Sequence, residues 1–509
     1  MKNFKIYTIL LAFVLGLTSC LDKYPDDAIP AKKAMNTVED VNQTVIGIYS
    51  SFLNGALYSG DLTLLPDLQS DFVYAVKGNT NIYGDIWRWD IHATNANITG
   101  VYAALYDVIG RCNFLLQHVD NIRQRTINED DLDRLTQYTG EAYFARALAY
   151  SELIKCFCVA YEGDEEAKNE LGVVIRKLYY SDEAITRSSL YDSYQFVLSD
   201  LDKAAEMLEL QDDYNPGIDG PLYNSPYFSE YTVYALRSRV ALYMKDYDEA
   251  IKYSSKVINS KYFQLSSTTE FVSQDVSFFR YMWTTDNSSE IIWKVGFTPT
   301  TYGAPLGQIF FNYDYRAFKP DYVPAQWVLN LYQNGDLRYD TYFVTKPTGF
   351  SHGLVWPLLA KYFGNTDLYN QARLLHTCMP KVFRLAEQYL IRAEAYAMGD
   401  KHDYSKAGKD IATLRAARYQ SFGGGVALGK DNALQVIEEE RVKELFMEGF
   451  RLQDLKRWHK GFERKPQSET LENGNRLKIE KDNALFVWPI PQHEIESQGS
   501  QIQPNESNK

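Results

Sequence analysis

The sequence predicts a mostly α-helical fold in which amphipathic helices pack in pairs beside an irregular, loop-rich region with a few short strands. Apolar residues recur at three- and four-residue steps, as on one face of a helix, in the stretches 38–53, 99–120, 131–158 and 191–210. Two later segments, 228–259 and 385–418, each contain a helical pattern, a short turn and a second helical pattern. Between them, residues 262–380 combine many aromatic side chains with frequent Gly, Pro, Asn and Thr, which favours loops and short strands such as 290–297.

The chain opens with a leader typical of export. Two lysines stand in a short basic start, an uncharged apolar run covers residues 6–17, and small residues follow up to Cys20. This arrangement predicts a secretory signal peptide over residues 1–19. The segment Leu17-Thr18-Ser19-Cys20 is similar to a bacterial lipobox, in which Cys20 becomes the lipidated first residue of the mature chain. Residues 20–36 are polar and rich in Asp, Lys and Pro, and we interpret them as the lipidated N-terminus and a tether.

Composition argues against several kinds of partner and site. The 66 acidic residues outnumber the 53 basic ones, the net charge is −13, and no basic stripe of useful length is present, so nucleic acid is not expected as a partner. Beyond the leader no apolar stretch is long enough to cross a bilayer, which leaves the lipid anchor as the expected contact with the membrane. The histidines show no metal-binding spacing, and no cofactor is expected. Cys112, Cys156, Cys158 and Cys378 remain after lipidation, and the sequence leaves open whether they pair. For Cys156 and Cys158, which point to different faces of a helix, buried single thiols are expected.

The paired helical segments resemble tetratricopeptide hairpins. In 228–259 a turn at Lys245-Asp246 separates the two helices, and Tyr247 and Ala250 open the second one. Residues 385–418 repeat this pattern. Small residues at the crossing points let the helices approach closely, and each hairpin buries its remaining apolar face on a neighbour. The sequence therefore predicts four such units, with two looser pairs at 38–120 and 131–210.

A single charge-rich helix is expected over residues 438–458. Its apolar stripe consists of Val442, Leu445, Phe446, Leu452 and Leu455. Acidic and basic side chains between Glu440 and Asp454 recur at i,i+3 and i,i+4 spacing, which suits ion pairs along a helix. We interpret this ladder as a structural salt-bridge network and not as catalytic machinery.

Four segments resemble the SusD/RagB family of outer-membrane nutrient-binding lipoproteins, and they occur in the family's order at 140–154, 384–397, 438–458 and 488–495. The resemblance covers essentially the whole mature chain. It implies a single SusD-like domain over residues 37–509, with the family's N-terminal half at about 37–260 and its C-terminal half at about 261–509. In such a domain four tetratricopeptide-like helix pairs form a scaffold, and irregular segments build the ligand face.

The resemblance also implies a function. Members of the family cap a TonB-dependent outer-membrane transporter, the SusC/RagA partner, and deliver oligosaccharides or, for some members, peptides. We therefore expect a non-enzymatic, lipid-anchored protein at the cell surface that captures oligosaccharides and passes them to such a transporter. An oligopeptide receptor on the same scaffold is the alternative, because residues 68–76 and 323–340 are somewhat closer to the RagB branch.

The first candidate ligand segment is 83–97, with the sequence YGDIWRWDIHATNAN. A glycan site needs flat aromatic faces for the apolar side of a sugar, and amide or charged groups for its hydroxyls. Tyr83, Trp87, Trp89 and Asn97 supply this combination, and the resemblance places a ligand loop just before the helix that follows. In an extended segment Trp87 and Trp89 would lie on the same side. The alternative is that one of them packs in the core.

The second candidate segment is 302–315, with the sequence YGAPLGQIFFNYDY. Tyr302 opens it, and Phe311, Tyr313 and Tyr315 alternate near its end. An extended segment would present these rings as a row on one side, and we expect Tyr302, Tyr313 and Tyr315 to contact the ligand. A buried edge strand is the alternative.

Two segments imitate catalytic motifs. Residues 349–353 satisfy G-x-S-x-G around Ser351, but a nucleophile elbow needs a helix directly afterwards, and Pro357 follows here without a helical run. Residues 424–430 match G-x-x-x-x-G-K, yet Asp431 stands where a Mg²⁺-binding Ser or Thr is required. A surface hydrolase using Ser351 is therefore the less favoured alternative, and 424–430 is interpreted as a linker.

Overall fold

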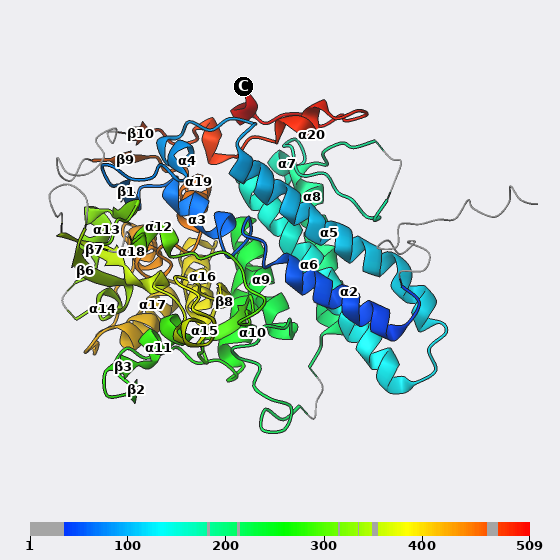
Figure 1. Cartoon of the computed structure of the whole chain (residues 1–509), viewed down its shortest axis with the longest axis horizontal. Coiled ribbons are helices and arrows are strands. Elements are labelled where there is room, and N and C mark those ends of the chain that lie inside the picture. Colours follow the sequence, from blue (N-terminus) through cyan, green and yellow to red (C-terminus); the bar gives the residue numbers. More distant parts are fainter. Residues whose placement is uncertain are drawn as a thin grey trace, which may run out of the picture.

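The computed structural model describes residues 35–180, 184–210, 214–313, 316–333, 335–348, 355–465 and 477–509. Helices dominate these residues and the strands are few and short (Figure 1), which confirms the predicted fold class. The leader, Cys20, Tyr315 and the motif around Ser351 lie outside the described residues.

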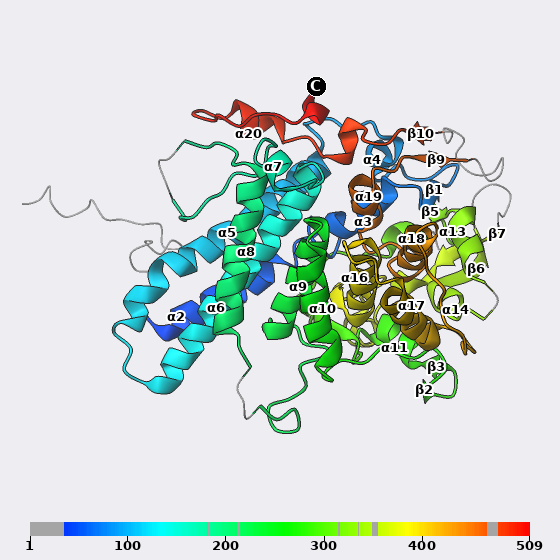
Figure 2. The same ribbon diagram turned by 180° about the vertical axis from the view of Figure 1, so that it is seen from behind.

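All four predicted helix pairs are present. Helix α6 contacts α5 and α8, and α16 contacts α10 and α17, so successive helices stack side by side (Figures 1 and 2). The pairs are α2 (Val38–Ser51) with α5 (Ala96–Arg123), α6 (Glu129–Phe157) with α8 (Leu190–Met207), α9 (Glu230–Tyr243) with α10 (Tyr247–Asn259), and α16 (Leu385–Met398) with α17 (Tyr404–Arg418).

Side-chain caps set where several of these helices begin. Thr37 closes a capping box with Asp40 at the start of α2, and Asp246 and Asp403 cap α10 and α17. Each cap accepts a hydrogen bond from a backbone N–H of the first helical turn, which has no partner inside the helix. Lys245, with a φ of 59°, turns the chain between α9 and α10 where the turn was predicted.

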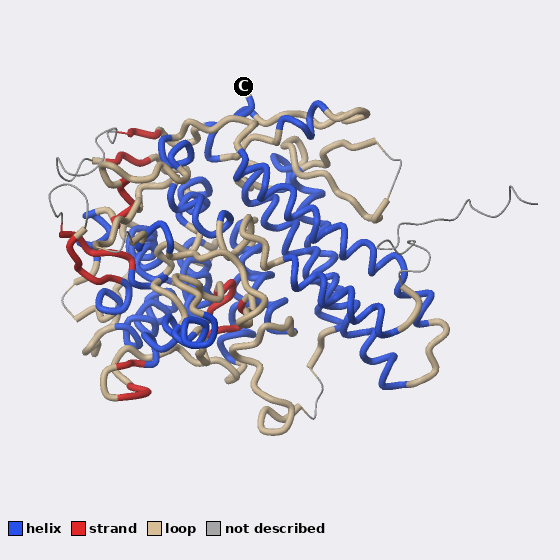
Figure 3. Tube along the Cα trace, in the orientation of Figure 1, coloured by secondary structure: helices blue, strands red, loops and turns tan. Residues whose placement is uncertain are grey.

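The strands form antiparallel two-stranded ladders, drawn in red in Figure 3. The predicted strand at 290–297 is present in shorter form as β4. The ladders are β1 (Val73–Ala75) with β5 (Tyr322–Pro324), β2 (Phe271–Ser273) with β3 (Val276–Ser277), β4 (Ile291–Lys294) with β8 (Lys381–Arg384), β6 (Phe343–Pro347) with β7 (Val355–Leu359), and β9 (Phe462–Arg464) with β10 (Leu477–Ile479).

Short helices connect these ladders to the helix pairs. They are α3 (Asp61–Leu68), α4 (Gly84–Arg88), α7 (Asp164–Ala167), α11 (Phe278–Thr285), α12 (Gln308–Phe311), α13 (Gln326–Leu331), α14 (Arg338–Tyr342), α15 (Thr366–Ala372), α18 (Ala433–Glu444), α19 (Arg451–Arg457) and α20 (Gln492–Glu496), together with the 3₁₀ turns η2 (Ala360–Tyr362), η3 (Ala484–Phe486) and η4 (Glu506–Asn508). The predicted linker at 424–430 is a loop before α18.

The prediction of one helix over 438–458 is wrong, because α18 ends at Glu444 and α19 begins at Arg451. Between the two helices Gly449 adopts a φ of 83°, which is incompatible with a continuous right-handed helix. The backbone N–H groups of Gly449 and Arg451 donate to the two carboxylate oxygens of Asp67 at 2.9 and 2.8 Å. A side chain from α3 thus takes the hydrogen bonds that a continuous helix would have made internally.

Helix α3 joins the two largest apolar cores. Its Leu62 and Leu65 belong to the core of the helix pairs, and its Leu64 and Leu68 belong to the core of the loop-rich region. An element that is buried on both sides holds the two parts of the molecule in a fixed relation. The loops of the second part are therefore carried on a rigid support.

The charged residues of α18 form a buried structural ion network, but most of its pairs run to other elements and not along one helix as predicted. Glu444 bonds Arg338, Arg384 and Arg418 at 3.1, 2.9 and 3.0 Å, and Glu290 also binds the last two. These arginines come from α14, β8 and α17, so the network ties α18 to three other elements, and a pair between Lys443 and Glu440 lies within α18.

Among the described residues no helix is long and apolar enough to cross a membrane. Cys112, Cys156, Cys158 and Cys378 are buried and unpaired, which confirms the single thiols predicted for Cys156 and Cys158. Burial raises the pKa of the Cys156 thiol to about 12 and keeps it protonated and unreactive.

Candidate ligand-binding face

Trp87 lies in the interior of the loop-rich region. Its side chain is 2% exposed, and its indole Nε1 donates to the Val73 carbonyl oxygen at 3.2 Å. The guanidinium carbon of Arg464 lies 4.6 Å from the centre of its ring. The expectation that Trp87 presents a free ring face to a ligand is therefore wrong.

Trp89 is also buried, in a separate apolar cluster. Its side chain is 8% exposed, and its Nε1 donates to the Gln69 carbonyl oxygen at 2.6 Å. The ring packs against Phe462 and Phe486. Trp89 has no ring face free for a sugar.

The two tryptophans diverge because residues 84–88 form α4 and are not extended. Tyr83 and Trp89 both adopt the left-handed conformation at its ends, with φ of 59° and 63°. The same-side rule for extended chain therefore does not apply, and the two indoles enter different cores.

Tyr83 and Asn97, by contrast, meet at one carboxylate. Asn97 Nδ2 donates to Asp61 Oδ2 at 3.1 Å, and the Tyr83 hydroxyl donates to the same carboxylate. Burial raises the pKa of Asp61, and the two hydrogen bonds oppose that rise. We call these three residues the Asp61 cluster. Its amide, phenol and carboxylate are the polar groups that sugar hydroxyls bond.

Tyr302 is 46% exposed and is held near the start of α3. The neighbouring Ala304 N–H donates to Ser59 Oγ at 3.1 Å. A Cβ at Gly303 would lie 2.4 Å from that oxygen, so glycine allows the loop to approach Ser59 closely. The loop that carries Tyr302 therefore contacts the chain at Ser59, just before α3.

Tyr313 is 57% exposed, but its segment is not an extended row of aromatics. Residues 308–311 form α12 and Phe311 is buried, so the prediction that its ring belongs to an extended, exposed aromatic row is wrong. Tyr313 instead packs on Phe318, with ring centres 5.4 Å apart.

Tyr313 lies at one end of an aromatic platform that is built around Phe311. Phe311 contacts the rings of Phe318, Phe363 and His376, with centres 5.8, 5.1 and 5.5 Å apart. Phe363 is 53% exposed. We define the Tyr313 platform as Phe311, Tyr313, Phe318, Phe363 and His376.

The sequence analysis did not identify Phe363 and His376, because neither stands in a distinctive local pattern. Both reach Phe311 only when the chain is folded. His376 Nδ1 lies 2.9 Å from the Phe363 carbonyl oxygen, and burial lowers the pKa of the imidazole. In the neutral ring Nδ1 donates to that carbonyl, which leaves Nε2 as an acceptor for a ligand hydroxyl.

A groove of about 330 Å³ leads toward Tyr302. Ile46 and Tyr49 of α2 and Leu53 just after it form one wall, and Tyr227 and Thr301 line the groove further along. Tyr227 is exposed and meets Tyr49 edge to face at 5.7 Å. Helix α2, which lines the groove, and α12, which carries Phe311, both lie toward the viewer in Figure 1.

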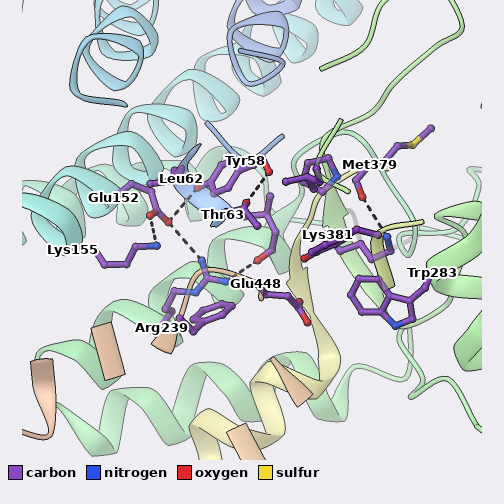
Figure 4. A pocket seen from close by; sticks show the side chains of 15 residues that line it. Tyr58, Leu62, Thr63, Glu152, Lys155, Arg239, Trp283, Met379, Lys381 and Glu448 are labelled. Carbon is purple, nitrogen blue, oxygen red and sulfur yellow. Dashed lines mark hydrogen bonds and ion pairs between the residues drawn. The ribbon is translucent and has the colours of Figure 1, made fainter. Parts of the chain in front are cut away.

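An interior cavity of about 40 Å³ lies between the helix pairs and the loop-rich region (Figure 4). Tyr58 donates to Glu152 Oε1 at 3.2 Å, and Arg239 lies 3.9 Å from the same carboxylate. This space suits a water molecule and is far too small for a sugar ring. The described residues also contain no group of His, Cys, Asp or Glu side chains that could hold a metal ion.

Two family models match the chain. Residues 351–506 match the model described as the SusD family, and residues 20–242 match the model described as "Starch-binding associating with outer membrane".

Known proteins of similar sequence and structure span nearly the same length. A SusD superfamily protein of Bacteroides thetaiotaomicron superposes with a TM-score of 0.75 at 26% identity, covering 92% of this chain and 99% of that one. A putative sugar binding protein of Bacteroides vulgatus gives 0.75 at 22% identity, covering 94% and 100%. SusD-like protein P25 of Formosa agariphila is 22% identical over 90% of both chains, whereas the match to SusD-like protein P2 spans 38% of that protein.

Proposed function

Because the chain belongs to the SusD/RagB family, we propose that it is a surface glycan-binding lipoprotein that passes oligosaccharides to a SusC/RagA-type TonB-dependent transporter. The family consists of binding proteins and not of enzymes. A similar structure carries the name of a putative sugar binding protein, and one matching family model names starch binding at the outer membrane. Both support a sugar as the ligand.

The Tyr313 platform is the observation that carries this proposal. Tyr313 and Phe363 offer exposed rings, and a sugar can lay its apolar C–H face on such rings. His376 Nε2 supplies an acceptor for a hydroxyl beside them. Tyr302 is also exposed, and the groove beside α2 offers further apolar surface, so a longer oligosaccharide would contact these as well.

Rigid support favours this mode of binding. The rings of the platform are packed on buried Phe311, and the loop-rich region is joined to the helix pairs through α3. A ligand therefore orders few side chains when it binds, and less of the interaction energy is lost to that ordering. The lipid at Cys20 would keep this face beside the transporter, since more than one acyl chain gives a stable anchor.

The full chain, purified in detergent, is expected to bind one or more glycans of a panel that also contains peptides. Tyr313→Ala combined with Phe363→Ala should weaken that binding at least about tenfold, because each ring contact contributes on the order of 1 kcal/mol. Isothermal titration calorimetry with the best glycan measures the effect. Tyr180→Ala combined with Phe271→Ala removes two exposed rings outside the platform and should leave the affinity unchanged.

Other results would change the proposed ligand class or the position of the site. Binding of peptides alone would make the protein an oligopeptide receptor, and unchanged glycan affinity in the platform variant would move the site to another surface. Hand-over to the transporter is tested separately, since affinity capture of the full chain from native membranes should also recover a TonB-dependent transporter. Capture without any such protein would argue against the partnership.

A further inference from the structure

A second pocket lies close to the C-terminus, between α7 and the chain that follows α19 (Figures 1 and 2). Its volume is about 440 Å³, within the range of small-molecule sites. It shares no residue with the platform, the groove or the Asp61 cluster. We call it the α7 pocket.

Much of the wall of the α7 pocket is apolar. Val159 and Ala160 follow α6, Ala167 ends α7, and Phe486 and Val487 belong to the segment around η3. Segments far apart in the sequence thus meet here and offer a ligand an apolar face.

A bridging histidine holds two walls of the pocket together. His459 Nε2 lies 2.8 Å from Glu162, and its Nδ1 lies 2.6 Å from Asp482. These contacts raise the pKa of His459, with the hydrogen bond to Asp482 as the main cause, so the ring favours its charged form. The pocket is therefore formed before any ligand arrives.

A smaller cavity of about 20 Å³ continues the pocket inward, and Val159, Ala160 and Lys456 line both spaces. Gln453 lines the inner cavity and is almost completely buried, yet neither its Oε1 nor its Nε2 has a hydrogen-bond partner among the described residues. The Tyr243 hydroxyl, which lines the same cavity, has no partner there either. Unsatisfied buried polar groups are costly, so these atoms call for a polar occupant.

The rim of the pocket carries an excess of negative charge. Glu162 and Asp482 are paired with His459, Glu162 is also paired with Lys245, and Glu506 is paired with Lys509. The Lys456 ammonium lines the pocket too, but it donates to the carbonyl oxygens of Lys155 and Cys158. Glu166 and Glu170 line the pocket without an ion-pair partner among the described residues. The rim therefore favours a cationic group.

We propose that the α7 pocket binds a small primary amine with an apolar face and a hydrogen-bonding group. The ammonium pairs with Glu166 and Glu170, the apolar face packs on Val159 and Phe486, and the hydrogen-bonding group enters the inner cavity and bonds Gln453. An amino sugar and the amine of a short peptide share this chemistry.

Calorimetry on the full chain separates these sources with four probes. Glucosamine and Nα-acetyl-lysine amide each carry one primary amine, whereas N-acetylglucosamine and Nα-acetyl-norleucine amide carry none. At least one amine should bind saturably and at least about tenfold more tightly than its matched neutral probe. If only glucosamine does so the source is a sugar, and if only Nα-acetyl-lysine amide does so the source is a peptide.

Variants locate the binding. Glu166→Gln combined with Glu170→Gln should weaken the amine about fivefold, since two exposed charge pairs are lost. Val159→Trp, placed at an exposed position on the rim, should abolish binding by filling the pocket. Glu165→Gln is the matched control, because Glu165 is a neighbour in α7 that pairs with Lys168 and does not line the pocket.

The proposal is overturned if neither amine binds saturably, if the neutral probes bind equally well, or if the Glu166/Glu170 variant binds like the parent. Glycan binding at the Tyr313 platform should be unchanged in all of these variants. Failure of the α7 pocket is therefore distinguishable from failure of the proposed glycan site.

Discussion

Replacing Glu444 by alanine should lower the free energy of unfolding by about 3–5 kcal/mol, because it leaves buried arginines without their shared carboxylate. Glu444 Oε2 accepts from Arg338 at 3.1 Å, and its Oε1 accepts from Arg384 and Arg418 at 2.9 and 3.0 Å. All four side chains are fully or almost fully buried. Burial alone would raise the pKa of Glu444, but the arginines, led by Arg418, hold it well below its ordinary value.

Urea denaturation followed by circular dichroism at neutral pH measures this effect. Glu444→Gln keeps the shape and one acceptor and should lie between the parent and the alanine variant. Glu439→Ala serves as the control, since Glu439 lies on the same helix and bonds only Gln435 there. If Glu444→Ala unfolds at the parent's urea concentration, the network does not stabilise the fold. Should it also alter ligand binding in the folded state, the structural interpretation fails.

Trp87→Ala is expected to destabilise the protein by about 3–5 kcal/mol, as for other large aromatic residues removed from a core. The substitution empties a site among buried residues of the loop-rich region and leaves the Val73 carbonyl without its indole donor. It also removes the ring on which the buried Arg464 guanidinium lies. Trp87→Phe should lower the stability less than Trp87→Ala does, because phenylalanine retains most of the packing while it loses the hydrogen bond.

Thermal unfolding of the three proteins ranks their stabilities, and glycan titration at low temperature tests the folded state. The folded Trp87→Ala protein should bind glycan with an affinity close to the parent's, because Trp87 has no free ring face. A variant that is as stable as the parent but no longer binds glycan would show that Trp87 contacts the ligand after all. Comparison with the Tyr313 and Phe363 variants, whose rings are exposed, separates the two roles.

The helix pairs could be predicted because their signal is local. Apolar steps of three and four residues, small residues at the crossings and a turn at Lys245-Asp246 are all visible in the sequence, and the structure contains each pair. The break between α18 and α19 could not be predicted in this way. It depends on Asp67, a residue far away in the sequence, which accepts hydrogen bonds from Gly449 and Arg451.

The same distinction between local signals and distant contacts applies to the candidate ligand-binding face. Composition singled out Tyr83, Asn97, Tyr302 and Tyr313, and the structure places these polar-tipped or amide side chains in loops or at helix starts. Their contact with a ligand stays a prediction. It could not tell which aromatic rings are free, because exposure depends on what packs against a ring. Trp87 and Trp89 look as suitable as Tyr313 in the sequence, yet both are covered by residues from distant segments.

The sequence by itself determined the class of fold, the family, the buried thiols of Cys156 and Cys158 and the structural character of the charged ladder. Each of these follows from local periodicity, from motif order or from the kind of residue involved. Tertiary structure alone decided which aromatics face solvent and where the predicted helix over 438–458 breaks. It also decided that Phe363 and His376 join the Tyr313 platform and that the α7 pocket forms. The physical reason is that exposure, cavities and unsatisfied hydrogen bonds arise where distant segments converge, and no stretch of sequence contains that convergence.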